Sequence, residues 1–347
     1  MKILMIGPAR SVHGGISGVV NNYYDAGLDK KVDLTYIGTM VEGSKVRKLL
    51  QAVIALVQYV FCLPGCDIVH VNVASDASFL RKSVFILLAH LCGKKLVIHQ
   101  HGGDFVGYYE TDGNEKRRRY VRKIFGMADA FLVLAPFWKE FFSQILPEEK
   151  ITVLPDAIKI PEQAQKEYGQ RKLLFLGRLC KGKGICELLD SVGNLKEKYP
   201  DMKLYLGGIW EEPQLQHQAE ACGAAVEWLG WISGKEKEEW LQKCDIFVLP
   251  SYFEGQSVSL LEAMAASCAP VVSEVGGIPM MITGEENGIF VKPQDAASLE
   301  AALDRVLADP ALCERLGRTA RQRAQQDFSL EDNMRKLLAI YERVMNV

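Results

Sequence analysis

Several patterns are missing from this 347-residue chain, and each absence argues against a class of protein. The nine cysteines, an odd number, include no Cys-x2-Cys pair, which argues against a zinc or disulfide framework and predicts reduced thiols in a cytoplasmic protein. No run reaches the roughly eighteen apolar residues that a transmembrane helix needs. The N-terminal apolar run is too short for a signal peptide and predicts a buried first strand. The dinucleotide-binding pattern Gly-x-Gly-x-x-Gly is also absent.

The composition is that of an ordinary soluble protein, with 48% hydrophobic and 24% charged residues, and the length suggests two domains. The net charge of −2 hides an asymmetry. Residues 1–160 hold 20 Lys and Arg against 15 Asp and Glu, and the remainder holds 21 against 28. A basic half predicts an anionic partner. Six basic residues in Lys116–Lys123 supply much of it, either as a solvated helix face or as a site for anionic lipid headgroups or a pyrophosphate.

Apolar runs alternate with amphipathic stretches along the whole chain, which is the pattern of parallel α/β sheets. The expected strands are 2–6, 32–37, 67–72, 95–99, 129–134 and 151–154, then 172–177, 203–207, 225–229, 245–249, 270–272 and 288–291. The expected helices are 16–28, 45–62, 78–92, 115–127 and 137–145, then 184–198, 212–222, 234–242, 257–267, 296–308, 311–326 and 330–345. We therefore predict two Rossmann-like domains facing each other across a cleft, 1–160 and 165–329, with the polar, aperiodic Pro161–Gln170 as linker.

Two carboxylates follow the strand that ends at Pro250. Glu254 is expected on the loop that leaves the strand, and Glu262 in the next helix, for which Ser257 is a suitable N-cap. Ligands of open α/β sheets bind outside the carboxyl ends of the strands, so both side chains are candidates for a polar ligand. The alternative is that Glu254 is an ordinary turn residue and Glu262 a solvated helix residue.

Three further motifs accompany this pair: Gly14-Gly15, Gly177-Arg178-x4-Lys183-Gly184 and Gly276-Gly277-Ile-Pro. Together with Glu254-x7-Glu262 they span nearly the whole chain, and the set resembles the family-4 retaining glycosyltransferases. The resemblance implies the GT-B fold, a two-domain α/β architecture. It also implies that the C-terminal helix, 330–347, packs back on the N-terminal domain.

The same resemblance implies a donor site in the C-terminal half. There Glu254 would contact the hydroxyls of the transferred sugar, Glu262 the ribose, and Arg178 and Lys183 the diphosphate, where fixed cations suit a departing phosphate. The other donor positions it implies are Gly255, Ser257 and the backbone of Trp231 and Ile232. It also implies Gly14 and Gly15, in a loop that touches either the donor diphosphate or the acceptor.

In the N-terminal half the segment His99-Gln-His101-Gly-Gly-Asp104 follows the fourth expected strand. Two histidines on one face of a strand are compatible with metal binding, but no third ligand is apparent nearby. The resemblance instead places His101 near the donor sugar and Asp104 near the acceptor, and His99 is expected in the core. The segment from His70 to Lys82 resembles a subgroup of the family that builds bacterial exopolysaccharides and capsules on polyprenyl-diphosphate lipids. That resemblance places Ser78, Arg81 and Lys82 on the acceptor side, with an ordinary capped helix as the alternative.

No metal or other cofactor is expected. The chain has no Asp-x-Asp, the usual divalent-ion site of the other major glycosyltransferase fold, and Arg178 and Lys183 would supply the positive charge instead. Leu49–Pro64 is the most apolar helix-length stretch and looks too short to span a bilayer. It either lies in a membrane interface or packs on the first sheet. Asp156 and Met280 depart from the family pattern, in which Asn and Glu are common.

With these motifs, the resemblance implies a metal-independent, retaining hexosyltransferase with Glu254, His101, Arg178 and Lys183 as catalytic residues. The donor would be a UDP- or GDP-sugar, and the acceptor a glycan or a polyprenyl-diphosphate-linked saccharide of a bacterial surface polysaccharide. The enzyme would be cytoplasmic, in contact with the anionic inner face of the plasma membrane, and would bind no nucleic acid. The alternatives are a GT-B sugar-nucleotide epimerase, which needs no acceptor, and a sugar-binding protein without chemistry.

Overall fold

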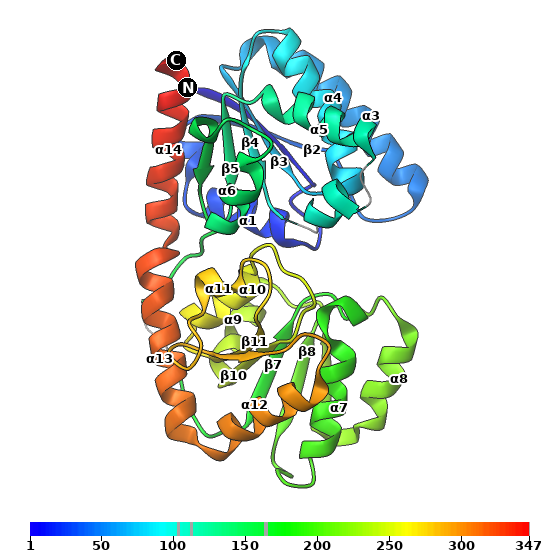
Figure 1. Cartoon of the computed structure of the whole chain (residues 1–347), viewed down its shortest axis with the longest axis vertical. Coiled ribbons are helices and arrows are strands. Elements are labelled where there is room, and N and C mark those ends of the chain that lie inside the picture. The colour runs from blue at the N-terminus through cyan, green and yellow to red at the C-terminus, as the bar shows by residue number, and fades with distance from the viewer. Residues whose placement is uncertain (103–104, 112–113, 163–165, 347) are drawn as a thin grey trace. The chain divides into compact units, whose positions relative to one another are not determined.

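The computed structural model describes residues 1–102, 105–111, 114–162 and 166–346, and its chain divides into two compact units. The N-terminal unit is Met1–Lys159 together with Leu330–Val347, and the C-terminal unit is Ile160–Ser329. Each unit holds one six-stranded sheet in which every pairing is parallel. The units have the same layered α/β plan (Figure 1).

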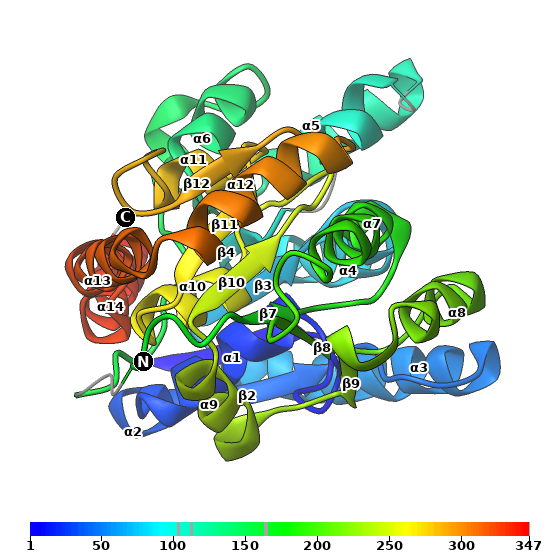
Figure 2. The same cartoon turned by 90° about the horizontal axis from the view of Figure 1, so that it is seen from below.

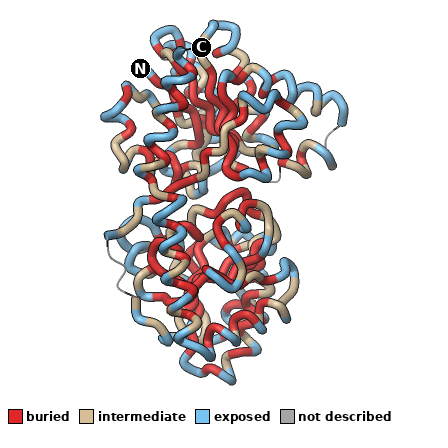
Figure 3. Tube along the Cα trace, turned by 60° about the vertical axis from the view of Figure 1, so that its left-hand side comes forward, coloured by how far each residue is buried: buried red, intermediate tan, exposed pale blue. Residues whose placement is uncertain are grey.

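The sheet of the N-terminal unit has the order β2-β1-β3-β4-β5-β6. Its four inner strands are almost fully buried because helices cover both faces of a parallel sheet, whereas the two edge strands are only partly buried (Figure 3). The strands are β1 (Lys2–Gly7), β2 (Asp33–Gly38), β3 (Ile68–Val73), β4 (Lys95–Gln100), β5 (Ala130–Val133) and β6 (Ile151–Val153). The helices are α1 (Gly15–Asp25), α2 (Leu28–Lys31), α3 (Lys45–Cys62), α4 (Asp76–Leu91), α5 (Glu115–Gly126), α6 (Pro136–Ser143) and α14 (Leu330–Asn346).

The C-terminal helix α14 is part of the N-terminal unit, where it packs on α1 and β4. Its start is fixed by the Leu330 amide, which donates to Ile158 O at 3.0 Å. Its far end is fixed by the buried Tyr341, whose hydroxyl lies 2.5 Å from Nδ1 of His70 on β3. Burial keeps the pKa of His70 well below its usual range, so the ring is neutral and accepts or donates this bond without a charge.

The sheet of the C-terminal unit has the order β12-β11-β10-β7-β8-β9. The strands are β7 (Lys172–Leu176), β8 (Lys203–Gly207), β9 (Val226–Gly230), β10 (Ile246–Leu249), β11 (Ala269–Ser273) and β12 (Ile289–Val291). The helices are α7 (Ile185–Leu195), α8 (Pro213–Ala221), α9 (Gly234–Lys243), α10 (Val258–Ala265), α11 (Ile278–Met281), α12 (Ala296–Ala308) and α13 (Pro310–Asp327). Helices α7 and α12 pack together on the sheet, as do α10 and α13 (Figure 2).

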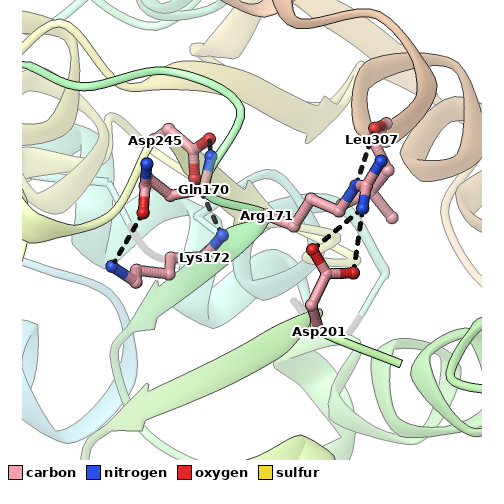
Figure 4. A network of polar contacts seen from close by, with 6 residues as sticks. All are labelled: Gln170, Arg171, Lys172, Asp201, Asp245 and Leu307. Atoms are coloured by element: carbon pink, nitrogen blue, oxygen red, sulfur yellow. Dashed lines mark hydrogen bonds and ion pairs between the residues drawn. The ribbon is translucent and has the colours of Figure 1, made fainter. Parts of the chain in front are cut away.

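From Lys166 onward, the segment expected to be a linker is hydrogen-bonded to the C-terminal unit. Tyr168 donates its hydroxyl to Ser267 O at 3.0 Å. The buried Asp245 carboxylate accepts from the backbone amides of Gln170 at 2.9 Å and Lys172 at 2.8 Å (Figure 4). These bonds fix the chain where it enters β7, a role that the polar composition of the segment did not reveal.

The expected strands and helices are confirmed, with ends shifted by a few residues. The four-residue helices α2 and α11 were not expected, because a helix of one turn is too short to show an apolar period. All nine cysteines are free thiols, as the sequence predicts.

Removing the Tyr341 hydroxyl tests how firmly α14 is held. We expect Tyr341→Phe to lower the free energy of unfolding by about 1 to 3 kcal/mol, because Nδ1 of the buried His70 loses its partner. The measurement is urea unfolding followed by circular dichroism. The exposed neighbour Glu342→Gln is the control and should stay within about 0.5 kcal/mol of the wild type. An unchanged Tyr341→Phe midpoint would mean that this bond does not anchor the helix.

Candidate functional site

The order of the strands places a candidate site in each unit. In the C-terminal unit the first strand, β7, lies between β8 and β10, so the helices after β7 and β10 leave in opposite directions. In the N-terminal unit the corresponding point lies between β1 and β3. Open α/β sheets bind ligands outside the carboxyl ends of the strands at such points. The sequence motifs that follow β7, β10, β1 and β3 therefore lie where the fold favours a ligand.

Lys183 and Glu254, which follow β7 and β10, are brought together at this point of the C-terminal unit. Lys183 Nζ lies 2.5 Å from Glu254 Oε1, and the Ser251 hydroxyl donates to the same oxygen at 2.7 Å. The two side chains are 22% and 9% exposed. This is a charge-assisted hydrogen bond that is partly open to solvent. The sequence predicted Lys183 and Glu254 as site residues but not Ser251.

Glycines allow the loops around this pair to touch. Gly184 has φ +71°, and a Cβ there would lie 2.1 Å from Pro250 O. Gly276 has φ +52°, and its Cβ would lie 1.8 Å from Glu254 O, while the Cβ of Gly277 would lie 1.9 Å from Gly255 O. The loops after β7, β10 and β11 therefore approach each other more closely than any other residue permits.

Glu262 also forms a cationic pair, with a residue that the sequence analysis missed. Helix α10 begins after Ser257, whose hydroxyl accepts from the Leu260 amide at 3.2 Å, so the predicted N-cap is confirmed. Lys237 on α9 lies with its Nζ 2.6 Å from Glu262 Oε1, and both side chains are partly exposed. Nothing in the sequence pattern of α9 distinguishes Lys237 from the other charged residues on that helix.

Arg178 is paired elsewhere than Lys183. Its Nη1 lies 3.1 Å from Glu211 Oε1, and the side chain is 61% exposed. Its backbone neighbourhood is again tight, because a Cβ at Gly208 would lie 1.8 Å from Gly177 O. Arg178 is thus an exposed cation beside the loop after β8.

The expected donor positions Trp231 and Ile232 lie after β9. Ile232 is buried against Gly207, whereas Trp231 is exposed. Trp228 is half exposed, and its indole N–H donates to Gly208 O at 2.8 Å. Gly255 is buried in the loop beside Glu254.

In the N-terminal unit, Gly14 and Gly15 are exposed at the start of α1. No atom lies within 4 Å of the Cβ that a side chain would add to either residue. Packing within the unit therefore does not require glycine at these positions, which leaves their expected role in close approach to a ligand as a prediction.

His101 is buried in the N-terminal unit, where one ring nitrogen is hydrogen-bonded and the other lies beside a carboxylate. Nε2 lies 2.8 Å from Asn72 Oδ1, and Nδ1 lies 3.3 Å from Asp156 Oδ1. The side chains of His101 and Asp156 are 2% and 4% exposed. Burial, together with the charge of Lys82, lowers the pKa of His101 to about 3, and burial raises the pKa of Asp156 to about 8. The expected contact between His101 and a sugar stays a prediction that requires the ring to leave one of these partners.

Ser78, Arg81 and Lys82 lie on α4, after β3. Lys82 is buried, and its Nζ donates to Ser78 Oγ at 3.1 Å; burial and the neighbouring Arg81 lower its pKa to about 7. Arg81 is half-buried. Asp104, the other expected acceptor residue, lies outside the described residues. Lys82 is therefore not an ordinary surface lysine, because a nearby anion would be needed to keep its buried ammonium charged.

Among the described residues, His99, His101 and Asp156 form the one group of three with the donor atoms of a metal site. One ligand atom of each lies within 4.8 Å of the other two. The sequence analysis found no third ligand beside the two histidines, because Asp156 lies after β6, far along the chain. The expectation that no third potential ligand lies near the two histidines is therefore wrong, because the fold brings Asp156 close to them.

Helix α3 exposes most of its apolar side chains. Only Ala55 and Tyr59 are buried; the exposed ones are Val46, Leu49, Leu50, Val53, Ile54, Val57, Val60 and Phe61. One helical stretch of the described chain, Lys45–Gly65, is long and apolar enough to cross a membrane by length and composition alone, with mean hydropathy 1.6 and 17% buried. The expectation that the stretch is too short is wrong, because the helix begins at Lys45, ahead of the apolar run.

The basic run Lys116–Lys123 forms most of α5. Two of its arginines are used inside the unit: Arg118 donates to Tyr109 O at 3.1 Å and to Glu110 O at 2.8 Å, and Arg117 donates to Tyr108 O at 3.4 Å. Lys116, Arg119, Arg122 and Lys123 are exposed. Two residues of the run therefore stabilise the preceding segment through backbone carbonyls, and the other four form a solvated basic face.

Comparison with known proteins agrees with a fold of two parallel α/β units that have charged loops at their strand ends. Residues 156–323, just under half of the chain, match the family described as Glycosyl transferases group 1. The chain has the GT-B fold: sucrose-phosphate synthase from Thermosynechococcus elongatus superposes with TM-score 0.83 at 21% identity, covering 100% of this chain and 99% of that one. Anabaena HepE in complex with UDP and glucose has TM-score 0.78 at 16% identity over 99% and 100%.

Curated relatives are similar over different lengths. The Mycobacterium tuberculosis glycogen synthase is 32% identical over 177 residues, 50% of this chain and 43% of that protein, so the match spans less than half of that relative. The N,N'-diacetylbacillosaminyl-diphospho-undecaprenol alpha-1,3-N-acetylgalactosaminyltransferase of Campylobacter jejuni is 27% identical over 331 residues, 94% of this chain and 81% of that protein.

The tight loop contact at Gly276 yields a stability test. We expect Gly276→Ala to lower the free energy of unfolding by more than about 2 kcal/mol, because φ is positive and the new Cβ overlaps Glu254 O. Urea unfolding measures it. Gly193→Ala is the matched control: Gly193 lies within α7 with no atom within 4 Å of the added Cβ, so alanine should stabilise by up to about 1 kcal/mol. Equal effects of the two changes would refute the close approach.

Proposed function

We propose that the protein is a retaining glycosyltransferase that moves a hexosyl unit from a UDP- or GDP-sugar to a glycan or a polyprenyl-diphosphate-linked saccharide. The observation that carries the proposal is the Lys183–Glu254 pair at the strand-order reversal, within the segment that matches the group 1 family. The acceptor class is supported by the Campylobacter jejuni relative, whose name specifies a diphospho-undecaprenol substrate.

In this proposal the C-terminal unit binds the donor. A lysine ammonium has three protons, so Lys183 can hold Glu254 with one and a phosphate oxygen with another. Its charge would stabilise the diphosphate as the bond to the sugar breaks. Glu254 would then be fixed to accept hydrogen bonds from sugar hydroxyls, and Glu262, fixed by Lys237, would bind the ribose.

Arg178 would act differently from Lys183. Its partner Glu211 is on an exposed loop, and the guanidinium is mostly in solvent, so exchanging Glu211 for phosphate oxygens costs little. A guanidinium binds phosphate in a two-pronged manner. We propose that the positive charges of Arg178 and Lys183 stabilise the anionic leaving group without a metal ion. Activity should therefore persist in EDTA. The exposed Trp231 and the loop containing Gly255 and Ser257 would border the nucleotide.

The N-terminal unit would bind the acceptor. Gly14 and Gly15 expose backbone at the start of α1, where unpaired N–H groups favour an anion. On α4, the buried Lys82 has a pKa near 7, and a diphosphate nearby would favour its charged form. A carboxylate on Asp104 is kept as a further proposed contact of the acceptor.

We also propose a cytoplasmic enzyme that touches the membrane through α3. Gln51 donates to Gly38 O at 2.7 Å and Tyr59 donates to Phe85 O at 2.8 Å, so one side of α3 is tied to the unit while its apolar side is exposed. Lys45, Arg47 and Lys48 add positive charge at its start. A tethered apolar helix with basic residues suits the surface of an anionic bilayer rather than a crossing of it.

A sugar-nucleotide epimerase and a sugar-binding protein are distinguished from a transferase by one assay. Purified protein is given UDP- and GDP-sugars with and without a lipid extract from bacterial membranes. Release of nucleoside diphosphate only with the extract supports transfer. Release without any acceptor indicates an epimerase or hydrolase, and binding without release indicates a protein that does no chemistry.

Substitution of Lys183 tests the donor site. We expect Lys183→Ala to abolish measurable turnover, a fall in kcat of at least about 10²-fold, because the leaving phosphate loses its fixed cation. The control is Lys181→Ala, whose exposed side chain is two residues away and which should keep near-wild-type turnover. Circular dichroism should show both variants folded. A folded Lys183→Ala variant with normal kcat would contradict the assignment.

Substitution on α3 tests membrane contact. We expect Val53→Glu with Val57→Glu to reduce binding to phosphatidylglycerol vesicles at least tenfold, since each exposed valine should contribute about 1.5 kcal/mol when buried in lipid. Vesicle sedimentation measures the binding. Phe137→Glu replaces an exposed apolar residue on α6 and is expected to change binding little. If Phe137→Glu weakens binding as much as the α3 change, the contact is not made by α3.

A further inference from the structure

The tautomer of His101 is fixed by the residues around it. Asn72 is buried, and its Nδ2 donates to Ile6 O at 3.1 Å, so its Oδ1 faces His101. His101 Nε2 lies 2.8 Å from that oxygen. An amide oxygen only accepts hydrogen bonds, so Nε2 must carry a proton.

The other nitrogen of the ring then faces a second acceptor. In a neutral imidazole with a proton on Nε2, Nδ1 is a lone pair. Nδ1 lies 3.3 Å from Asp156 Oδ1, with both side chains almost fully buried. Two lone pairs at this distance repel unless a proton lies between them, and a buried charged pair would carry a large cost of desolvation.

We propose that Asp156 is a neutral carboxylic acid that donates its hydroxyl proton to Nδ1 of His101. The pair then carries no net charge and no ionised member, as burial favours, and both ring nitrogens are satisfied. Lys82 stands close enough to lower the pKa of His101, so an imidazolium at this place is disfavoured further. The raised pKa of Asp156 agrees with the geometry but is not needed for it.

A proton suits this place better than a metal ion. His99 and His101 have their ring centroids 4.0 Å apart with 40° between the planes, a tilted arrangement. The lone pair of an imidazole nitrogen lies in the plane of its ring, so a metal ion would need the lone pairs of two tilted rings to meet at one point. The proton needs only the His101–Asp156 contact.

The shared proton makes Asp156 a positioning residue. It links the end of β4, which carries His101, to the segment after β6, and Asn72 extends the link to β3 and β1. The backbone on both sides of Asp156 is also fixed: Pro155 O accepts from Asn333 at 2.5 Å, and Ala157 O accepts from Asn22 at 3.0 Å. The inference concerns the N-terminal unit alone and does not rest on the proposed transfer reaction.

The test compares three substitutions at one site. The amide of asparagine donates through Nδ2 as the acid does through its hydroxyl, so Asp156→Asn should keep the melting temperature of the wild type. Asp156→Ala should lower it by about 4 °C or more, because Nδ1 of His101 loses its donor. Asp156→Leu, which keeps the branched shape but has no donor, should behave like alanine. A loss in Asp156→Asn equal to that in Asp156→Ala would overturn the proposal.

The matched control is the same change at Asp245. That buried carboxylate accepts from two backbone amides, Gln170 N and Lys172 N, and so must be an acceptor on both oxygens. Asp245→Asn turns a donor toward an N–H group and should lower the melting temperature, where Asp156→Asn does not. If both asparagine variants were equally harmful, Asp156 would be an acceptor and the proposal would fail.

Nitrogen NMR of the histidine side chains reads the tautomer directly. With ¹⁵N-labelled histidine, and His101→Gln to assign the signal, His101 should show a protonated Nε2 and an unprotonated Nδ1 at pH 7 in both the wild type and Asp156→Asn. An imidazolium signal would overturn the proposal. So would one equivalent of a transition metal in the purified protein that is lost in Asp156→Ala. None of these measurements requires a sugar donor or an acceptor substrate, so they are independent of the proposed function.

Discussion

The site in the C-terminal unit depends on how closely backbone can approach backbone at the ends of β7, β10 and β11. Neighbouring strands in a sheet are separated by roughly 5 Å, which leaves little room for three loops that all turn toward the same crevice. Gly184 and Gly276 resolve the crowding by adopting positive φ with carbonyl oxygens where side chains would be. The Lys183–Glu254 contact at 2.5 Å follows from this packing, because it joins two of the loops that the glycines bring together.

The two units use the same topology with different electrostatics. At the strand ends of the C-terminal unit, cations and carboxylates form partly exposed pairs that keep their charge and can exchange partners with a ligand. In the N-terminal unit the groups after β3, β4 and β6 are buried, and burial moves the pKa values of Lys82 and Asp156 toward neutrality, to about 7 and about 8. The basic character of residues 1–160 is therefore a property of exposed residues such as those on α5, not of this buried cluster.

The alternation of apolar runs and amphipathic stretches was enough to predict both sheets and their helices, because parallel strands are buried on both faces. It also predicted that Glu254 and Lys183 lie at strand ends. A position of this kind can be recognised from the local sequence, because the apolar run of the strand comes directly before it. Lys237 could not be predicted in the same way, since every exposed lysine of α9 has the same sequence context. Asp156 was recognised as unusual, but its contact with His101 depends on the packing of β4 beside β5 and β6, which no local pattern contains.

Helix α3 shows the same limit for surfaces, since an apolar helix has one composition whether its face is covered or exposed. Its packing links the surface to the site. Gln51 holds the first half of α3 to Gly38, the last residue of β2, and a Cβ at Gly38 would meet Ala9 after β1 at 2.8–3.2 Å. The start of α3 therefore lies at the same edge of the sheet as the loop that leads to Gly14 and Gly15. In a polyprenyl diphosphate the phosphates lie at the membrane surface. A unit that rests on lipid through α3 would thus meet the diphosphate at the strand ends where its exposed glycine backbone is placed.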